Sequence, residues 1–80
     1  MIRIAKTSRL TTDEIIHRAS AFFGEGGEGL KQTSRQDCCV SFAGGGAHVA
    51  VFVAGENTHR TVEVESQELE YQTKRFLESV

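Results

Sequence analysis

The chain has 80 residues and a formal net charge of −2. This length fits one small domain, residues 1–80, and it excludes most large catalytic folds and any enzyme with a separate cofactor lobe. Leu, Ile, Val and Phe make up 20 of the 80 residues, which is enough apolar side chain for a folded rather than a disordered chain.

Charge and hydropathy restrict the partners and the compartment. The small net charge gives no general electrostatic attraction to nucleic acid or to an anionic membrane. No window approaches the roughly 18 to 20 apolar residues that a membrane-spanning helix needs, and the first six residues lack the layout of a secretory signal. Two adjacent cysteines cannot build a disulfide framework. We therefore expect a cytoplasmic protein without nucleic-acid or membrane partners.

The first eight residues predict a short strand. Ile2 and Ile4 alternate with Arg3 and Ala5, which gives the period of two that is typical of a strand with one buried face. Its short length and polar tail suggest an edge of the sheet, but the pattern leaves open whether this strand lies centrally or at an edge.

A helix is predicted after Thr11. Thr11 and Glu14 have the spacing of a capping box, and Leu10 and Ile15 have the spacing of a hydrophobic staple. Gly24 then supplies a stop signal. The apolar stripe of this helix consists of Ile15, Ile16, Ala19, Phe22 and Phe23.

Residues 24–29 match the letters of the dinucleotide-binding fingerprint GxGxxG. In that motif the glycines follow a strand and open a helix, so that backbone N–H groups face a pyrophosphate. Here the glycines follow a helix and precede strands, and Glu25 and Glu28 would repel an anion. We interpret the segment as a connector.

Beyond this connector the apolar period changes to two, which predicts antiparallel strands near residues 30–35, 38–43, 47–54 and 59–65. The pattern leaves open whether residues 30–43 form one bulged strand or two.

Residues that pair across a hairpin share a face, which fixes the expected registers. We place a two-residue turn at Gly44–Gly45, where a type I′ turn needs two positive φ angles, and a second turn through residues 55–58. The resulting pairs are Val40 with Val49, Cys38 with Val51, Val53 with Val62, and Val51 with Val64. One valine-rich face therefore runs across three strands.

The last segment predicts a second helix. Ser66 is expected as its N-cap, Glu68 lies in the first turn, and Glu70 and Lys74 form a favourable i,i+4 pair. The inward stripe of this helix consists of Leu69, Thr73, Phe76, Leu77 and Val80.

The elements follow in the order β-α-β-β-β-β-α. Two amphipathic helices and one apolar sheet face predict an α+β fold. We expect a two-layer α/β sandwich with a mostly antiparallel sheet and both helices packed on the valine-rich face.

The second face of the predicted sheet has an unusual composition. A face that stays in water normally carries charged or long polar side chains, whereas the two middle strands here carry small residues and one phenylalanine. Such a face is covered by a second copy, another protein or a small ligand, unless the sheet simply tolerates alanine there. The middle strands present Cys39, Ser41, Ala43, His48, Ala50, Phe52 and Ala54.

The adjacent cysteines are expected to separate, because successive residues of a strand point to opposite faces. We expect Cys38 in the core and Cys39 on the second face, without a disulfide between them. Ser41 lies opposite His48 in the predicted register, so Cys39 is a diagonal neighbour of His48. Cys39, His48 and Phe52 therefore define an alternative ligand- or metal-binding site, although a third metal ligand is missing.

The sequence contains no set of residues that is typical of a catalytic site. Ser41 near His48 lacks an orienting acid, and Cys39 as a nucleophile is a third hypothesis that requires a reactive thiol. Phe52 alone beside two glutamates does not fit an RNA-binding sheet. Tyr71 lies outside the inward stripe of the last helix, either packed on Arg75 or contacting a partner.

We predict a non-catalytic interaction module that self-associates as a homodimer, or binds another protein, through the second face or a strand edge. No catalytic residue, metal or cofactor is assigned, and a small-molecule ligand stays an alternative. The candidate interface residues are Cys39, Ser41, His48, Ala50, Phe52 and Tyr71.

Overall fold

The computed structural model describes residues 2–56 and 59–80. It contains antiparallel strands and two helices in the predicted order, so the α+β class is confirmed. The elements are β1 (Ile2–Ser8), α1 (Thr12–Phe23), β2 (Lys31–Arg35), β3 (Cys39–Gly44), β4 (Ala47–Glu56), β5 (His59–Gln67) and α2 (Glu70–Glu78).

Among the described residues, five strands form one sheet in the order β1-β5-β4-β3-β2. β1 lies at one edge, which decides a position that the sequence left open, and it pairs with β5 over its whole length. β2 lies at the other edge, so residues 30–43 contain two strands rather than one. The β2–β3 register shifts between Gln32 and Ser34, which marks an irregularity in this edge strand.

The β4–β5 hairpin has the predicted register. Val53 pairs with Val62, and Val51 pairs with Val64. The predicted turn includes residues 57–58, which lie outside the described residues.

The β3–β4 hairpin is shifted by two residues from the prediction. Val40 pairs with Val51 instead of Val49, because the turn is formed by Gly45–Gly46, with φ angles of 57° and 85°. Three consecutive glycines allow either turn, since glycine adopts positive φ without steric cost. A shift of two residues keeps every side chain on its predicted face.

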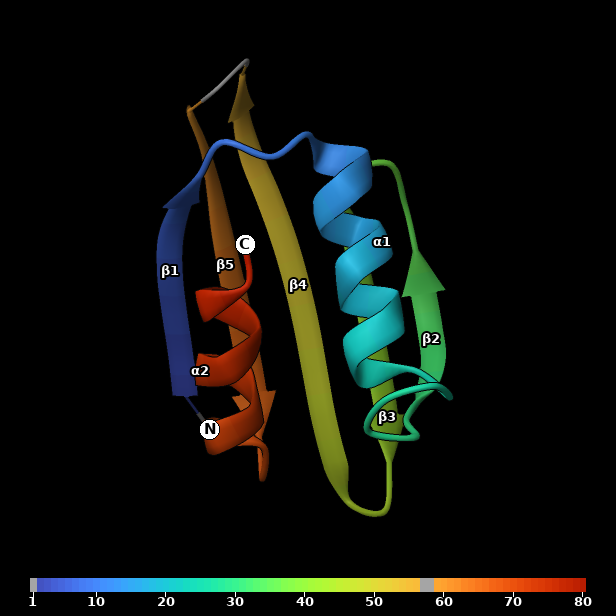
Figure 1. Ribbon diagram of the computed structural model, residues 1–80. Helices are drawn as coiled ribbons and strands as arrows, with labels where there is room; N and C mark the ends of the chain where they lie inside the picture. Colours follow the sequence, from blue (N-terminus) through green and yellow to red (C-terminus); the bar gives the residue numbers. More distant parts are fainter. Residues whose placement is uncertain (1, 57–58) are drawn as a thin grey trace.

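Both helices lie in front of the sheet in Figure 1, α1 over β3 and β4 and α2 over β5 and β1. The ring of Phe23 on α1 lies 6.0 Å from that of Phe42 on β3 and 5.3 Å from that of Phe76 on α2. These aromatic contacts join the two helices to the sheet. The buried cluster consists of Ile15, Ile16, Ala19, Phe23, Leu30, Val40, Phe42, Val49, Val51, Val53, Val62, Val64, Phe76 and Leu77.

The start of α1 forms half of the predicted capping box. Thr11 Oγ1 accepts a hydrogen bond from the Glu14 backbone N–H at 3.1 Å. The Glu14 carboxylate, however, accepts from Arg18 Nε at 3.0 Å. The helix ends at Phe23, and Gly24 follows it as predicted.

The predicted N-cap of α2 is wrong. Ser66 belongs to β5, where it pairs with Ile2 and Val49 and is buried, and α2 begins only at Glu70. Pairing with strands on both sides satisfies the Ser66 backbone inside the sheet, which a cap at the end of a helix would not do. The predicted inward stripe of α2 is confirmed, because Thr73, Phe76 and Leu77 are buried and Leu69 and Val80 pack against the core.

The C-terminal end of α2 is held by neighbouring elements. Carbonyl groups at the end of a helix lack intrahelical donors, and side chains can supply them. The bonds run from Lys6 Nζ to Leu77 O (2.7 Å), from Arg18 Nη1 to Ser79 O (2.8 Å) and from Ser8 Oγ to Val80 O (2.8 Å). β1 and α1 thus fix the position of α2 on the sheet.

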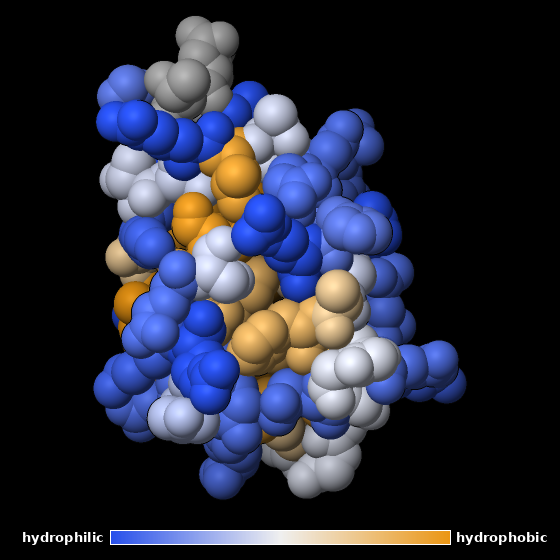
Figure 2. Space-filling view, in the orientation of Figure 1, coloured by the Kyte–Doolittle hydropathy of each residue, from blue (hydrophilic) through white to orange (hydrophobic). Residues whose placement is uncertain are grey.

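The helix side of the molecule is largely hydrophilic at its surface. Figure 2 shows polar residues over most of this side and hydrophobic residues gathered near its middle. Within residues 2–56 and 59–80, no helix is long and apolar enough to cross a membrane.

Candidate functional site

The sheet has a second face that the helices do not cover, and we call it the open face. Its residues follow from the alternation along each strand and from the pairing registers. It consists of Arg3, Ala5 and Thr7 on β1, Lys31 and Ser34 on β2, Cys39, Ser41 and Ala43 on β3, His48, Ala50, Phe52 and Ala54 on β4, and Thr61, Glu63, Glu65 and Gln67 on β5. The residues of β3 and β4 in this set form the central strip.

Ala50 and Phe52 lie in the middle of the central strip. Ala50 is only 8% exposed although no helix covers it, because Ser41 and Glu65 flank it on the neighbouring strands. Phe52 is 38% exposed and is the large hydrophobic residue of this face. The strip therefore presents a small-residue surface with one aromatic side chain standing above it.

A charged cluster borders the central strip on the β1–β5 side. Arg3 Nε donates a hydrogen bond to Glu63 Oε1 at 2.8 Å, and Arg3 Nη2 lies 3.9 Å from Glu65 Oε2. The Glu63 hydrogen bond, together with the charges of Glu63 and Glu65, raises the pKa of the Arg3 guanidinium. Two carboxylates share one guanidinium, so this flank keeps a net negative charge.

The structure brings Cys39, Ser41, His48, Ala50 and Phe52 onto the open face, as the alternation predicts. The Ser41 hydroxyl lies 3.0 Å from the hydroxyl of Thr33 on β2, and either can donate. His48 lies opposite Ala43 and Gln67.

Tyr71 does not join this set. It lies on α2 and is 66% exposed, with its hydroxyl 3.4 Å from Arg75 Nη1 and its ring 5.9 Å from the Arg75 guanidinium carbon. The hydrogen bond to Tyr71 raises the pKa of Arg75. Tyr71 therefore packs against the arginine side chain, on an element that the open face does not include.

The expectations for the two cysteines are wrong. Cys38 and Cys39 form a disulfide, Cys38 is exposed rather than buried, and β3 begins at Cys39. Cys38 belongs to the β2–β3 turn, where the pleat of the strand does not constrain it, so the sulfurs of adjacent residues can meet. The disulfide removes the free thiol that a nucleophile or metal ligand requires, and it removes the cysteine argument for a reducing compartment.

The corrected register also separates Cys39 from His48. Cys39 lies opposite Phe52, four residues along β4 from His48, or about 13 Å at the usual strand rise. The predicted diagonal contact assumed a turn at Gly44–Gly45, one residue before the turn that forms. Within the part of the chain that the structure describes, no three side chains of His, Cys, Asp or Glu gather to hold a metal ion.

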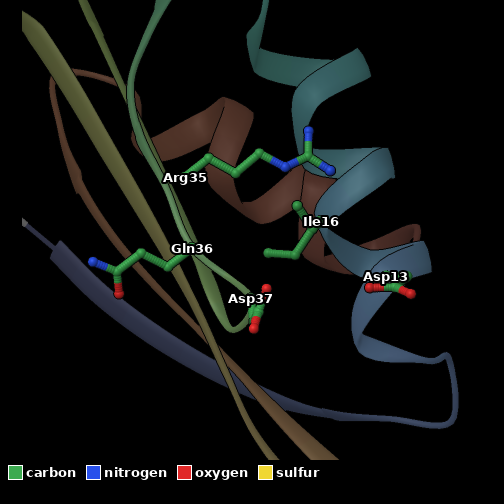
Figure 3. A pocket seen from close by; sticks show the side chains of 5 residues that line it. All are labelled: Asp13, Ile16, Arg35, Gln36 and Asp37. Atoms are coloured by element: carbon green, nitrogen blue, oxygen red, sulfur yellow. The ribbon is translucent and has the colours of Figure 1, made fainter.

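A small cavity lies beside the β2–β3 turn, at the N-terminal part of α1. It has a volume of about 170 Å³ and is lined by Asp13, Ile16, Arg35, Gln36 and Asp37. Figure 3 shows the Arg35 side chain extended towards α1, with the Asp37 side chain at the turn. Sequence reasoning did not find this cavity, because it depends on how the turn lies against α1.

Comparisons with known proteins do not assign the chain to a family. No protein-family model matches it, and no match was found among curated proteins or solved structures.

Proposed function

We propose that the chain is a small non-catalytic interaction module, a two-layer α/β sandwich that self-associates through its open face. The observation that supports this function is the composition of the central strip, which contains no Asp, Glu, Lys or Arg. A sheet face that remains in water normally alternates such residues with the core positions. The strip therefore has the composition of a covered surface.

The shape of the central strip suits packing against a second sheet. Two sheets pack about 10 Å apart with their strands nearly aligned, and small side chains permit this approach. Phe52 supplies a single large anchor, of the kind that dominates binding energy at interfaces.

The charges beside the strip favour a second copy as the partner. A two-fold axis parallel to the strands places the β5 flank of one copy, with Glu63 and Glu65, over the β2 flank of the other copy, where Lys31 lies. Opposite charges then face each other on both sides of the strip. Such complementarity sets orientation and specificity more than affinity.

The area of the open face limits the stability of this dimer. Five strands about 4.8 Å apart, with about six residues along each at a rise of about 3.3 Å per residue, give about 500 Å² per copy. A standard stable interface buries about 800 Å² per partner. We therefore expect a reversible homodimer that dissociates on dilution.

Native mass spectrometry and sedimentation equilibrium of protein purified without chelator test this function. We expect a dimer for the wild type and for Ala21→Arg, a matched control at an exposed position of α1. We expect a monomer for Ala54→Arg, which adds the same charge at an exposed position of the open face. Ala50→Arg acts at the centre of the strip, but Ala50 is buried in the monomer, so Ala54→Arg is the decisive variant.

Two outcomes would overturn the proposal. One is a wild type that stays monomeric at high concentration, and the other is a dimer that Ala54→Arg does not weaken. A monomer that carries a metal or small-molecule mass would support ligand binding instead of self-association.

A further inference from the structure

The β2–β3 turn places the cysteine pair at the end of the sheet. Gln36 and Cys39 exchange both backbone hydrogen bonds, at 2.8 and 3.2 Å, which leaves Asp37 and Cys38 as the two turn residues. Cys38 is exposed, and Cys39 is half-buried at the first position of β3. Neither belongs to the buried cluster, so a thiol in solution can reach Cys38 without opening the core.

The position of this disulfide does not suit a structural cross-link. A bond between adjacent residues closes the shortest possible loop, so it constrains the unfolded chain less than any other disulfide. The turn that carries it borders the cavity between β2 and α1, so a local rearrangement of the turn meets open space. Exposed disulfides are the ones that exchange with thiols.

The pair is coupled to the open face through β4. Cys39 lies directly opposite Phe52, and the Cys38 carbonyl accepts a hydrogen bond from the Val53 backbone N–H at 3.0 Å. A regular strand directs adjacent side chains to opposite faces, whereas the disulfide holds these two together. Opening the bond frees Cys38 to turn away from Cys39, which changes the surface beside Phe52.

We propose that Cys38–Cys39 is a thiol–disulfide exchange site for a dithiol reductant, and that its reduction weakens self-association through the open face. The second part rests on the proposed function, and the first part does not. A thiolate of the reductant attacks Cys38 Sγ and forms a mixed disulfide. The bond to Cys39 breaks, and the Cys39 thiolate takes a proton from water.

The second thiolate of the reductant completes the reaction. It attacks the reductant sulfur of the mixed disulfide and releases the Cys38 thiolate, which is protonated in turn. The reductant leaves as a cyclic disulfide, oxidised by two electrons, and the protein gains two electrons and two protons.

Reduction weakens the dimer because the disulfide orders two side chains beside Phe52 before the faces meet. Free Cys38 and Cys39 side chains lose conformational freedom on association, and immobilised side chains reduce affinity. We expect a dissociation constant about two- to tenfold higher for the reduced protein.

Thiol counting tests the exchange site independently of the dimer. Native protein is incubated with dithiothreitol at neutral pH, then alkylated and weighed by mass spectrometry. We expect no alkylation before reduction, two alkylated cysteines after it, an unchanged circular dichroism spectrum, and closure of the pair by oxidised glutathione. A pair that opens only in denaturant would overturn the proposal, as would two free thiols that oxidised glutathione does not close.

Sedimentation equilibrium with and without dithiothreitol tests the coupling. The matched control is the double variant Cys38→Ser/Cys39→Ser, which cannot form the bond. We expect the reductant to weaken the wild-type dimer and to leave the double variant unchanged. The coupling would be overturned if dithiothreitol weakened the dimers of the wild type and the double variant equally. It would also be overturned if dithiothreitol left a wild-type dimer unchanged. A wild type that is monomeric in both states overturns the coupling and the proposed dimer, while the thiol count still decides the exchange site.

Discussion

The two faces of strands β3, β4 and β5 differ sharply although they share one backbone. Towards the helices these strands present valines and Phe42, each no more than 7% exposed. On the open face the same strands present alanine, serine, glutamate and Phe52, which is 38% exposed. The period of two thus separates a face that packs against the helices from a face that the helices leave uncovered.

Burial gives this difference an energetic scale. A fully buried valine or phenylalanine side chain contributes about 1.5–3 kcal/mol relative to an exposed one. The helix-covered face holds most of these side chains in one cluster. Mutations on that face should therefore act on the free energy of unfolding, and mutations on the open face should act on association.

The largest effect is expected from a matched pair of phenylalanine substitutions. Phe76 is fully buried between α1 and the sheet, so Phe76→Ala should lower the free energy of unfolding by about 3–5 kcal/mol. Phe52→Ala on the open face should cost at most about 1 kcal/mol. Urea unfolding followed by circular dichroism, at a concentration where the chain is monomeric, measures both. Equal losses would show that the open face carries as much of the fold as the covered face.

A smaller effect of opposite sign is expected at Thr73 on α2. Thr73 is fully buried, and its Oγ1 has no hydrogen-bond partner among the described residues. Because an unsatisfied buried hydroxyl is unfavourable, Thr73→Val should stabilise the fold by about 1 kcal/mol, seen as a higher urea midpoint. Thr33→Val is the control, since that hydroxyl bonds to Ser41 on an exposed strand. A loss of stability in Thr73→Val would contradict the unsatisfied hydroxyl.

The smallest effect is expected from Arg3→Gln at the edge of the open face. Arg3 is exposed, so its ion pair with Glu63 is screened by salt, and the difference from wild type should disappear in concentrated NaCl. The hydrogen bond and charge of Glu63 raise the pKa of Arg3 in the folded state. The ion pair therefore stabilises the fold fully at pH values below the unfolded-state pKa of Arg3, and this stabilisation is lost only as the pH rises through the folded-state pKa. The difference in thermal midpoint should therefore stay constant between about pH 7 and about pH 9. A difference that grows with salt would contradict this assignment.

The fold was largely predictable because its patterns are local. Spacing within one element predicts the N-cap at Thr11, the alternation of valines in the strands and the buried stripe of α2. The structure contains each of these features at the predicted residues. The start of α2 was not predictable, because Ser66 pairs with Ile2 from the other end of the chain. A long-range partner decided between two roles that are both acceptable locally.

The candidate site was predictable in its composition and not in its contacts. The two-residue shift of the β3–β4 register leaves each side chain on its predicted face. It changes the residue opposite His48, which is Ala43 instead of the predicted Ser41. The Cys38–Cys39 disulfide was excluded by the assumption of a continuous strand. It forms because β3 begins at Cys39, one residue later than the pattern indicates, so that Cys38 lies in the turn.

The sequence by itself determined the class of each element and the division of the strands into an apolar and a mixed face, because periodicity is a property of neighbouring residues. Only the tertiary structure decided the strand order, the β3–β4 register, the joining of the cysteines and the placing of Phe52 beside them. Those features depend on which of several locally equivalent pairings buries the valines under α1 and α2. That choice is made by packing between residues far apart in the chain.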